Sequence, residues 1–368
     1  MMKVLIVHRV NKDKASVKGI YQKLAGIREG FKSNGWQADE ICPGTDGIYF
    51  NGILTSENGL FGEDQVFREA TKLGDLETYD WIYLRFAPLS FWLYRSLMHL
   101  KKRCPNVTII MEFANYPFEY ELPFIKKTIF RLLFKPRLHY LKELVDYALH
   151  LGAETSVLGI PAIRFDNGFD AKSVRPKHDK ALNANVNLLY VGALWPWQGL
   201  EELILKIREE SQKSDVGWKL TIVGDGPHKK TLEEFIRSKN MQDTVEMMAP
   251  AHGPALDEIF DVAHFGVGTL QNTQRKLPYA ANLKHRHYAA RGLPFFCDVP
   301  DPGFSTCEKG YFQFKTGNVN LKDLVDWLKA SSEKDLADTS AYLVQFAANH
   351  FDWKAIIGNV IENVNSQH

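Results

Sequence analysis

The stretch NLLYVGALWPWQGLEELILKIR (residues 187–208) contains one complete strand–loop–helix unit. Its first five residues, Asn187–Val191, form a continuous apolar run, which is typical of a strand buried on both faces of a parallel sheet. From Leu200 onwards, the apolar residues recur at helical spacing. The same order returns with KLTIV at Lys219–Val223, a glycine-rich loop and a second helical run. This repetition predicts an α/β fold built on parallel strands.

The amino-terminal half of the chain follows the same plan. KVLIV at Lys3–Val7 predicts a buried strand, and the segment Ile20–Phe31 has the apolar spacing of a helix. Further strands are expected at Trp81–Leu84 and Val107–Met111. Strands and helices that alternate in this way predict doubly wound, Rossmann-like sheets.

Two domains are expected in a chain of 368 residues, because a single domain usually holds about 100–200 residues. The sequence becomes polar and charged between residues 171 and 187, as linkers often do. We therefore predict one domain over residues 1–173 and a second over residues 174–347. A terminal helix within residues 348–368 is expected to pack back on the first domain.

Composition argues against several classes of protein. A net charge of +1 gives no overall field to attract nucleic acid, so we expect no nucleic-acid partner. The four cysteines are scattered and form no C-x-x-C pair, which fits a reducing cytoplasm better than a disulfide framework or a zinc site. The first residues lack the pattern of a signal peptide, and no apolar run approaches the roughly 18 residues that span a bilayer. A cytoplasmic protein is expected.

Glycines follow the first two predicted strands of the second half, Asn187–Val191 and Lys219–Val223, in the loop before each helix. Gly192 follows the first strand, and Gly224 and Gly226 follow the second. Glycine allows a phosphate to approach the backbone, and a helix amino terminus attracts negative charge. Neighbouring loops of this kind indicate a site for a nucleoside diphosphate, although the glycines could equally serve only to make tight turns. The loop GDGP does not continue into the dinucleotide fingerprint.

Three segments of the second half resemble, in order, the donor-domain motifs of the retaining glycosyltransferase family 4. They are LLYVGALWPWQGLEELI (188–204), LTIVGDGPHKKTLEEFI (220–236) and LKHRHYAARGLP (283–294). In the first half, IMEFANYPFEYEL (110–122) resembles a segment of members from bacterial polysaccharide clusters, and NGFD at 167–170 resembles the step that closes their first domain.

The resemblance implies a GT-B fold, in which two Rossmann-like domains face each other across a cleft. It also implies transfer of a sugar from a nucleoside-diphosphate donor to a glycan or lipid-linked glycan, with retention of configuration, in the synthesis of cell-surface polysaccharide or glycoconjugate. No other cofactor is expected. No D-x-D pair occurs in the sequence to hold a metal ion, which agrees with the metal-independent chemistry of the family.

The donor site is expected at the motif positions and departs from the family in three places. Ala193 and Gln198 stand where most members carry Arg and Lys, and His287 replaces a glutamate that holds the ribose. We expect Lys284, a candidate catalytic residue, to balance the diphosphate charge in their place, although Lys284 and Arg286 could also be ordinary surface residues of a helix. The expected donor-binding residues are Gly192, Trp197, Gln198, Gly199, Gly224, Gly226, Lys284, Arg286 and His287.

The three departures leave a second hypothesis open, a degenerate GT-B protein that binds nucleotide sugars or acts as a scaffold without turnover. On the acceptor side, polar residues follow strands of the first half, where they would face the cleft. Glu112, directly after an apolar run, is a second candidate catalytic residue, whereas Glu119 could be an ordinary surface acid. The expected acceptor-binding residues are Arg85, Glu112, Asn115, Tyr116 and Glu119.

The segment Lys126–Lys142 interleaves six basic residues with apolar ones and contains no acid. This pattern is typical of an interfacial helix on an anionic membrane surface. An ordinary amphipathic helix with a basic outer face would give the same pattern. We expect peripheral membrane binding, because members of the resembled family often use lipid-linked acceptors.

Overall fold

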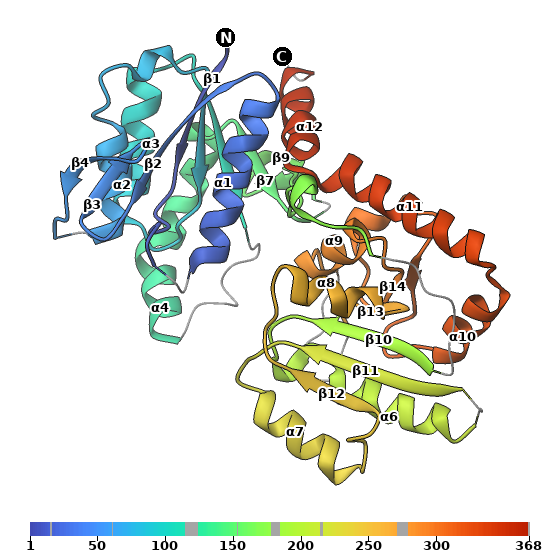
Figure 1. Cartoon of the computed structure of the whole chain (residues 1–368). Coiled ribbons are helices and arrows are strands. Elements are labelled where there is room, and N and C mark those ends of the chain that lie inside the picture. Colours follow the sequence, from blue (N-terminus) through green and yellow to red (C-terminus); the bar gives the residue numbers. More distant parts are fainter. Residues whose placement is uncertain are drawn as a thin grey trace. The chain divides into compact units, whose positions relative to one another are not determined.

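The computed structural model describes residues 1–14, 17–60, 62–114, 124–152, 154–177, 185–213, 216–270 and 279–366. The chain divides into two compact units (Figure 1). Unit 1 comprises Met1–Phe169 together with Asp352–His368, and unit 2 comprises Asp170–Phe351. The boundaries expected from the sequence were 173/174 and 347/348.

Unit 1 is built on a nine-stranded sheet of order β4-β3-β2-β1-β5-β6-β7-β9-β8. The six central strands, β2-β1-β5-β6-β7-β9, pair in parallel. At one edge β3 and β4 add antiparallel pairs, and at the other edge β8 pairs antiparallel with β9. The strands are β1 (Lys3–Val7), β2 (Gln37–Pro43), β3 (Gly47–Phe50), β4 (Ile53–Glu57), β5 (Trp81–Arg85), β6 (Thr108–Phe113), β7 (Tyr147–His150), β8 (Ser156–Val157) and β9 (Ile160–Arg164). The α-helices are α1 (Lys18–Ser33), α2 (Gln65–Ala70), α3 (Phe91–Arg103), α4 (Phe124–Ile129), α5 (Leu141–Leu144) and α12 (Trp353–Asn365).

The period of two along the central strands divides the core of unit 1 into two layers. On β1, Leu5 and Val7 point into the cluster that includes residues of α3 and α5, whereas Val4 and Ile6 point into the cluster that includes α1 and α12. Both faces of the sheet are therefore covered, which explains why these strands read as unbroken apolar runs.

The terminal helix α12 packs against α1, and two glycines of α1 make this contact possible (Figure 1). A Cβ atom on Gly26 would lie 2.0 Å from the Trp353 Nε1 atom, and one on Gly30 would lie 2.6 Å from the Trp353 carbonyl oxygen. The helix α12 begins after Asp352, whose side chain accepts a hydrogen bond from the Lys354 N–H at 2.9 Å. Residues from the two ends of the chain thus share one core layer.

Unit 2 is built on a six-stranded, fully parallel sheet of order β12-β11-β10-β13-β14-β15. The strands are β10 (Asn185–Val191), β11 (Gly217–Val223), β12 (Val245–Met248), β13 (Phe265–Val267), β14 (Phe295–Cys297) and β15 (Tyr311–Gln313). The α-helices are α6 (Leu200–Ser211), α7 (Lys229–Ser238), α8 (Pro254–Asp261), α9 (Leu283–Ala290), α10 (Leu321–Ala330) and α11 (Glu333–Phe351). This strand order is that of a Rossmann sheet. The strands β11 and β12 are added on one side of β10, and the strands β13 to β15 are added on the other side, so the strand order reverses between β10 and β13.

The segment that was expected to form one interfacial helix is divided into four short pieces. After α4 come a π-helical turn (Phe130–Phe134), a 3₁₀ segment (Lys135–Tyr140) and α5. Ile125 and Leu132 are 73% and 71% exposed, while Phe130 and Leu141 are buried in the core of unit 1. In the described part of the chain, no helix is long and apolar enough to cross a membrane.

The glycine contacts between α1 and α12 lead to a test of their packing. We expect Gly30→Ala to lower the free energy of unfolding by roughly 1–3 kcal/mol, because its Cβ would overlap the Trp353 carbonyl and the Ile357 side chain. Urea denaturation would measure the change. Gly19→Ala is the matched control, because a Cβ on Gly19 in the same helix would have nothing within 4 Å. Equal effects of the two substitutions would contradict this account of the packing.

Candidate functional site

A cavity of about 390 Å³ lies in unit 2 at the carboxyl end of β10. This position is the switch point of the sheet, where parallel α/β folds bind their ligands. Three segments line the cavity: the end of β10 with its loop, the region around the start of α8, and the first turns of α9. The residues are Tyr190, Val191, Gly192, Ala193, Gln198, Ala251, His252, Leu256, Phe260, Asn282, Leu283, Lys284, His287 and Tyr288.

Tyr288 fixes α9 at this switch point. Its hydroxyl lies 3.1 Å from the carbonyl oxygens of Leu189 on β10 and Val267 on β13, and it accepts a hydrogen bond from the Val191 N–H at 3.1 Å. Because Tyr288 bridges the two strands where the order reverses, the residues one turn earlier on α9 are held against the end of β10.

Lys284 brings an unpartnered cation to the cavity. Its Nζ atom is buried and, among the described residues, makes no hydrogen bond. It lies 4.4 Å from the centre of the Tyr190 ring, which provides a weak cation–π contact. Burial lowers the pKa of Lys284 to about 7. A buried amine without a partner is costly, so an anionic group that enters the cavity would find a donor whose charge is not already compensated.

His287 lines the same cavity one turn further along α9 and is neutral at pH 7. Burial and the adjacent Arg291 lower the pKa of His287 to about 4. An Nη1 hydrogen of Arg291 points to the His287 Nδ1 atom at 3.3 Å, and Arg291 forms an ion pair with Asp257 at 3.1 Å. This geometry makes Nδ1 the acceptor and places the ring proton on Nε2. The side chain at this position of the cavity is therefore uncharged.

The predicted glycines differ in what they do. Gly192 lines the cavity directly. Gly224 and Gly226 lie behind that loop, where a Cβ atom would come within 2.0 Å of the Gly192 carbonyl oxygen and 2.3 Å of the Leu194 carbonyl oxygen, respectively. Gly199 adopts a left-handed conformation, with φ 68°, directly before α6. Gly224 and Gly226 thus determine the path of the loop that forms the cavity wall.

Arg286 was expected at the donor site, but the structure pairs its side chain with Asp301, outside the cavity lining, and the prediction for it is corrected. Its side chain is fully buried and forms an ion pair with both oxygens of Asp301. His285 bonds the same carboxylate at 2.6 Å. On a helix, residues two apart do not share a face, so Arg286 points away from the face that carries Lys284.

The predicted Trp197 does not line the cavity but stacks on Trp195, with ring centres 4.9 Å apart and planes 10° from parallel. Both residues lie in the loop between Gly192 and α6. Gln198, which follows them, does reach the cavity wall. Of the donor-binding residues predicted from the sequence, the cavity therefore brings together Gly192, Gln198, Lys284 and His287.

In unit 1, the predicted Arg85 and Glu112 meet at the carboxyl ends of β5 and β6. Arg85 donates to the Glu112 Oε2 atom at 2.8 Å, Tyr83 donates to the same atom at 2.7 Å, and the Lys23 Nζ atom lies 2.7 Å from Oε1. Burial alone would raise the pKa of Glu112, but Lys23, Arg85 and the hydrogen bonds outweigh burial and lower it to about 2. Glu112 is thus a fixed, buried carboxylate that positions its two cations.

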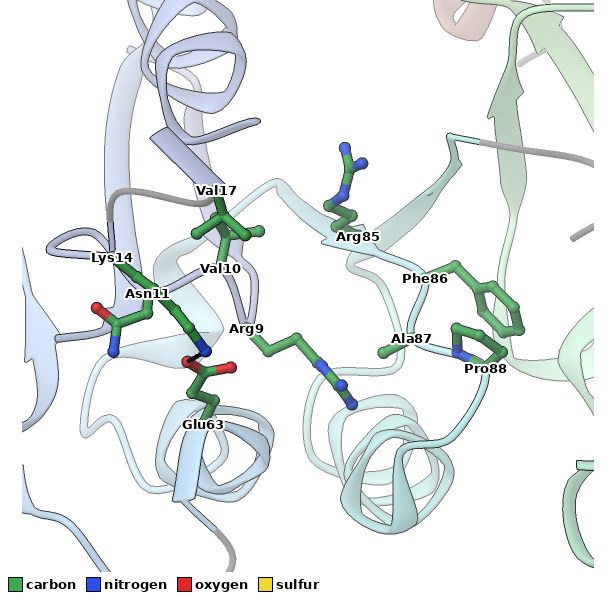
Figure 2. A pocket seen from close by; sticks show the side chains of 10 residues that line it. All are labelled: Arg9, Val10, Asn11, Lys14, Val17, Glu63, Arg85, Phe86, Ala87 and Pro88. Carbon is green, nitrogen blue, oxygen red and sulfur yellow. Dashed lines mark ion pairs between the residues drawn. The ribbon is translucent and has the colours of Figure 1, made fainter. Parts of the chain in front are cut away.

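A second cavity, of about 250 Å³, adjoins Arg85 (Figure 2). Residues after β1 and after β5 line it, including Arg9 and Ala87. The other expected acceptor residues, Asn115, Tyr116 and Glu119, lie outside the described residues.

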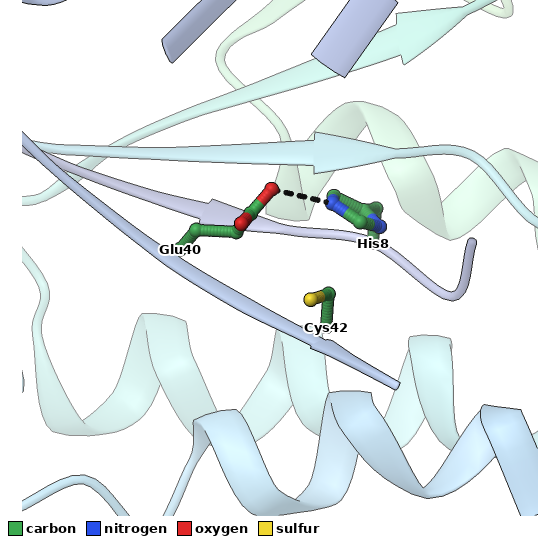
Figure 3. Close-up of side chains that lie close together, drawn as sticks. All are labelled: His8, Glu40 and Cys42. Carbon is green, nitrogen blue, oxygen red and sulfur yellow. Dashed lines mark hydrogen bonds and ion pairs between the residues drawn. The ribbon is translucent and has the colours of Figure 1, made fainter. Parts of the chain in front are cut away.

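His8, Glu40 and Cys42 lie close enough together to be considered as metal ligands (Figure 3). However, the His8 Nδ1 atom accepts the Val10 N–H at 3.2 Å, and its Nε2 atom lies 3.0 Å from Glu40. Burial raises the pKa of the Cys42 thiol to about 12, so the thiol stays protonated. These contacts are those of a hydrogen-bonded cluster that holds β1 against β2, and they leave no histidine lone pair for a metal.

The third wall of the unit 2 cavity, formed by Ala251, His252, Leu256 and Phe260, was not predicted from the sequence. These residues match no quoted motif. A usable signal was the pair Gly253-Pro254, because proline in the first turn of a helix after a strand marks a loop at the carboxyl edge of the sheet.

Burial of the Lys284 amine leads to a prediction about stability. Because its pKa is lowered to about 7 in the folded state, the unfolded chain binds more protons between that pH and the ordinary lysine range. The contribution of this group to stability therefore rises with pH across that window and is smallest below pH 7. We expect Lys284→Met to raise the unfolding free energy by roughly 1–3 kcal/mol at pH 6.5 and by much less near pH 10.

Urea denaturation at the two pH values would measure this difference. Lys230→Met, on an exposed position of α7 in the same unit, is the control and should change the unfolding free energy equally at both pH values. If Lys284→Met behaves in the same way as this control, the Lys284 amine is not buried as described.

Comparisons with known proteins bear on both the family and the fold. The model of the family Glycosyl transferases group 1 matches residues 170–265, which lie in unit 2. No curated protein matches the sequence.

Solved structures resemble the whole chain. Anabaena Alr3699/HepE in complex with UDP and glucose is 12% identical, with full coverage of both chains and a TM-score of 0.60. The sucrose-phosphate synthase (tll1590) from Thermosynechococcus elongatus is 15% identical, with full coverage and a TM-score of 0.59. The lipopolysaccharide outer core galactosyltransferase WaaB, in its apo form, is 11% identical, with full coverage and a TM-score of 0.62. The predicted α/β fold is confirmed: the chain has two Rossmann-like units and the GT-B fold of glycosyltransferases.

Proposed function

We propose that the protein is a glycosyltransferase that moves a sugar from a nucleoside-diphosphate donor to an acceptor. One observation carries the proposal: the Lys284 amine, which has no hydrogen-bond partner among the described residues, lies in a cavity at the switch point of a Rossmann sheet. Such a position is where nucleotides bind in this type of fold, and a diphosphate supplies the charge that the amine lacks. The family match over residues 170–265 and the UDP complexes of the HepE structures support the same reading.

Each part of the cavity has a task in this reaction. The Gly192 loop brings backbone N–H groups to the phosphates, and Lys284 takes up a proton as the diphosphate binds, because the bound anion favours the charged amine. The same ammonium stabilises the negative charge that grows on the leaving diphosphate when the sugar bond breaks. His287, neutral and anchored by Arg291, offers its Nε2–H side to a hydroxyl of the nucleoside.

We assign to the reaction retention of configuration and independence of metal ions, on the resemblance to the retaining family 4. Lys284 replaces the charge that the family supplies at the positions of Ala193 and Gln198. In this proposal Glu112 is not a general base, because its pKa is held at about 2. Turnover in the presence of EDTA should match turnover with added Mn²⁺, and loss of activity in EDTA that Mn²⁺ restores would contradict metal independence.

We further propose an acceptor that is a glycan or a lipid-linked glycan, and a role in the synthesis of polysaccharide or glycoconjugates. The resemblance of 110–122 to polysaccharide-cluster members supports this assignment, as does the fold shared with a lipopolysaccharide galactosyltransferase. The alternative is a protein that binds nucleotide sugars without turnover. Ala193, Gln198 and His287 favour that alternative, and a measurement of donor hydrolysis distinguishes the two.

The donor site gives a prediction about binding. Calorimetry should show that Lys284→Met weakens UDP binding by about ten- to hundredfold, because a charge-assisted hydrogen bond to the diphosphate is lost. Uridine, which has no phosphate, should bind the variant and the wild type equally.

The control for this measurement is Lys230→Met, which should leave UDP affinity unchanged. Full UDP affinity in Lys284→Met would place the donor elsewhere. Wild type should also hydrolyse UDP-glucose slowly in the absence of acceptor. Tight UDP binding without any hydrolysis or transfer, over a panel of UDP-sugars, would favour the binding protein over the enzyme.

A membrane-facing surface on unit 1 is the remaining part of the proposal. Exposed apolar side chains of the segment 124–144, such as Leu132 and Leu133, lie among basic residues. Tyr140 and Leu144 of the same segment line a groove of about 450 Å³ together with residues of α3, including Phe91 and Met98. Apolar side chains beside lysine and arginine fit the interface of an anionic bilayer.

We expect the protein to bind vesicles of phosphatidylglycerol and phosphatidylcholine, with an affinity that falls as salt is raised. Leu132→Ser combined with Leu133→Ser should weaken this binding about tenfold or more in a flotation assay, because about 0.8 kcal/mol is lost for each CH₂ group withdrawn from the interface. Leu205→Ser, at an exposed position of α6, is the matched control. Unchanged binding by the double variant would favour an ordinary solvent-facing surface.

A further inference from the structure

The cavity of unit 1 lies at the switch point of the other sheet. In unit 1, β1 pairs with β2 on one side and with β5 on the other. The chain passes from β1 to β2 and only later crosses to β5, so the strand order reverses at β1. The cavity is lined by Arg9, Val10 and Asn11 after β1 and by Arg85 to Pro88 at the end of β5, so it occupies the position where such folds bind ligands (Figure 2).

The cavity has an excess of positive charge. Arg9, Lys14 and Arg85 line it, and among the residues that the structure describes, Glu63 is the single acid of its lining. The nearby Glu112 carries one negative charge but pairs with two cations, Arg85 and Lys23, the latter at 2.7 Å. It therefore leaves part of their positive charge uncompensated.

The ion pairs of Arg9 and Lys14 leave the N–H donors of these side chains available. The Lys14 Nζ atom lies 3.6 Å from Glu63, and the Arg9 Nη1 atom lies 3.6 Å from Asp64. Both distances exceed that of a normal N–H···O hydrogen bond. Asp64 is in addition engaged by α3, since its Oδ2 atom accepts the Phe91 N–H at 3.1 Å. An oxyanion in the cavity would therefore meet N–H donors that no close acceptor in the described part of the chain occupies.

We propose that this cavity binds the anionic group, a phosphate or a carboxylate, of a sugar acceptor. The inference rests on the proposed function, because it assigns the donor to unit 2 and leaves unit 1 for the acceptor. The planar guanidinium groups of Arg9 and Arg85 suit oxyanions, and Asn11 on the same wall adds an amide that can bond a sugar hydroxyl. A volume of about 250 Å³ accommodates the anionic group with part of its ring rather than a whole nucleotide.

The test uses the full chain saturated with UDP, so that anion binding at the donor site is excluded. Calorimetry is performed with glucose 6-phosphate, glucuronate and methyl glucoside. We expect one of the two anionic sugars to bind and the uncharged one to bind at least tenfold more weakly, and the anion that binds identifies phosphate or carboxylate as the natural group. Arg9→Gln and Lys14→Gln should each weaken that anion about tenfold and leave UDP affinity unchanged.

Lys12→Gln is the control, because Lys12 lies in the same loop, pairs with Asp13 and does not line the cavity. The side chains of Arg9 and Lys14 are 41% and 58% exposed, so their variants should fold, and thermal unfolding checks this. The inference is overturned if neither anionic sugar binds, if Lys12→Gln loses as much affinity, or if Arg9→Gln weakens UDP instead. Failure of UDP itself to bind would sink the proposed function, and the same titrations without UDP would still decide the cavity.

Discussion

The order of the parallel strands is the constraint on which both cavities depend. In a parallel sheet all strands end at one edge, and only at the point where the order reverses do neighbouring loops diverge and leave room for a ligand. The chain meets this condition twice, beside β10 in unit 2 and beside β1 in unit 1, and each reversal carries a cavity. The helices pack on the faces of the sheets and keep the strands in place. In unit 1, for example, α12 from the far end of the chain packs in one core layer with Val4 and Ile6 of β1.

The two cavities differ in how they present positive charge. In unit 2 a single amine is buried over an aromatic ring, so its charge is expensive until an anion arrives. In unit 1 the charges are partly exposed and loosely paired with acids, so they cost little in the absence of a ligand. In the proposed reaction, a buried amine whose charge is not compensated favours a tightly held group such as the diphosphate of the nucleotide sugar. Partly exposed cations suit a sugar acceptor that must enter and leave.

Much of the fold could be predicted from the sequence, as could part of the lining of the candidate site. Apolar runs and glycine positions predict the strands and the edge at which they end. Two of the three motif segments contain Gly192, Lys284 and His287, which the cavity unites. The prediction for Arg286 failed for a simple geometric reason. Arg286 is two residues after Lys284, and residues two apart lie on nearly opposite faces of a helix, whereas Lys284 and His287 are three apart and share a face. The wall around His252 belongs to none of these motifs, and Gly253-Pro254 indicates only that a loop is there. Its place in the cavity depends on contacts between residues far apart in the sequence, such as the ion pair of Asp257 with Arg291. In the acceptor region, the commitment of Glu112 to Lys23 depends on a contact between residues far apart in the sequence.

The central claim is that the end of β10 and the start of α9 form a donor diphosphate site whose charge comes from Lys284. A crystal structure of the protein with UDP tests this claim most directly. The account predicts diphosphate oxygens within hydrogen-bond distance of the Lys284 Nζ atom and of the backbone N–H groups after β10, with the nucleoside between His287 and the wall near His252. UDP bound at another place, with the Lys284 amine still buried and untouched, would contradict it.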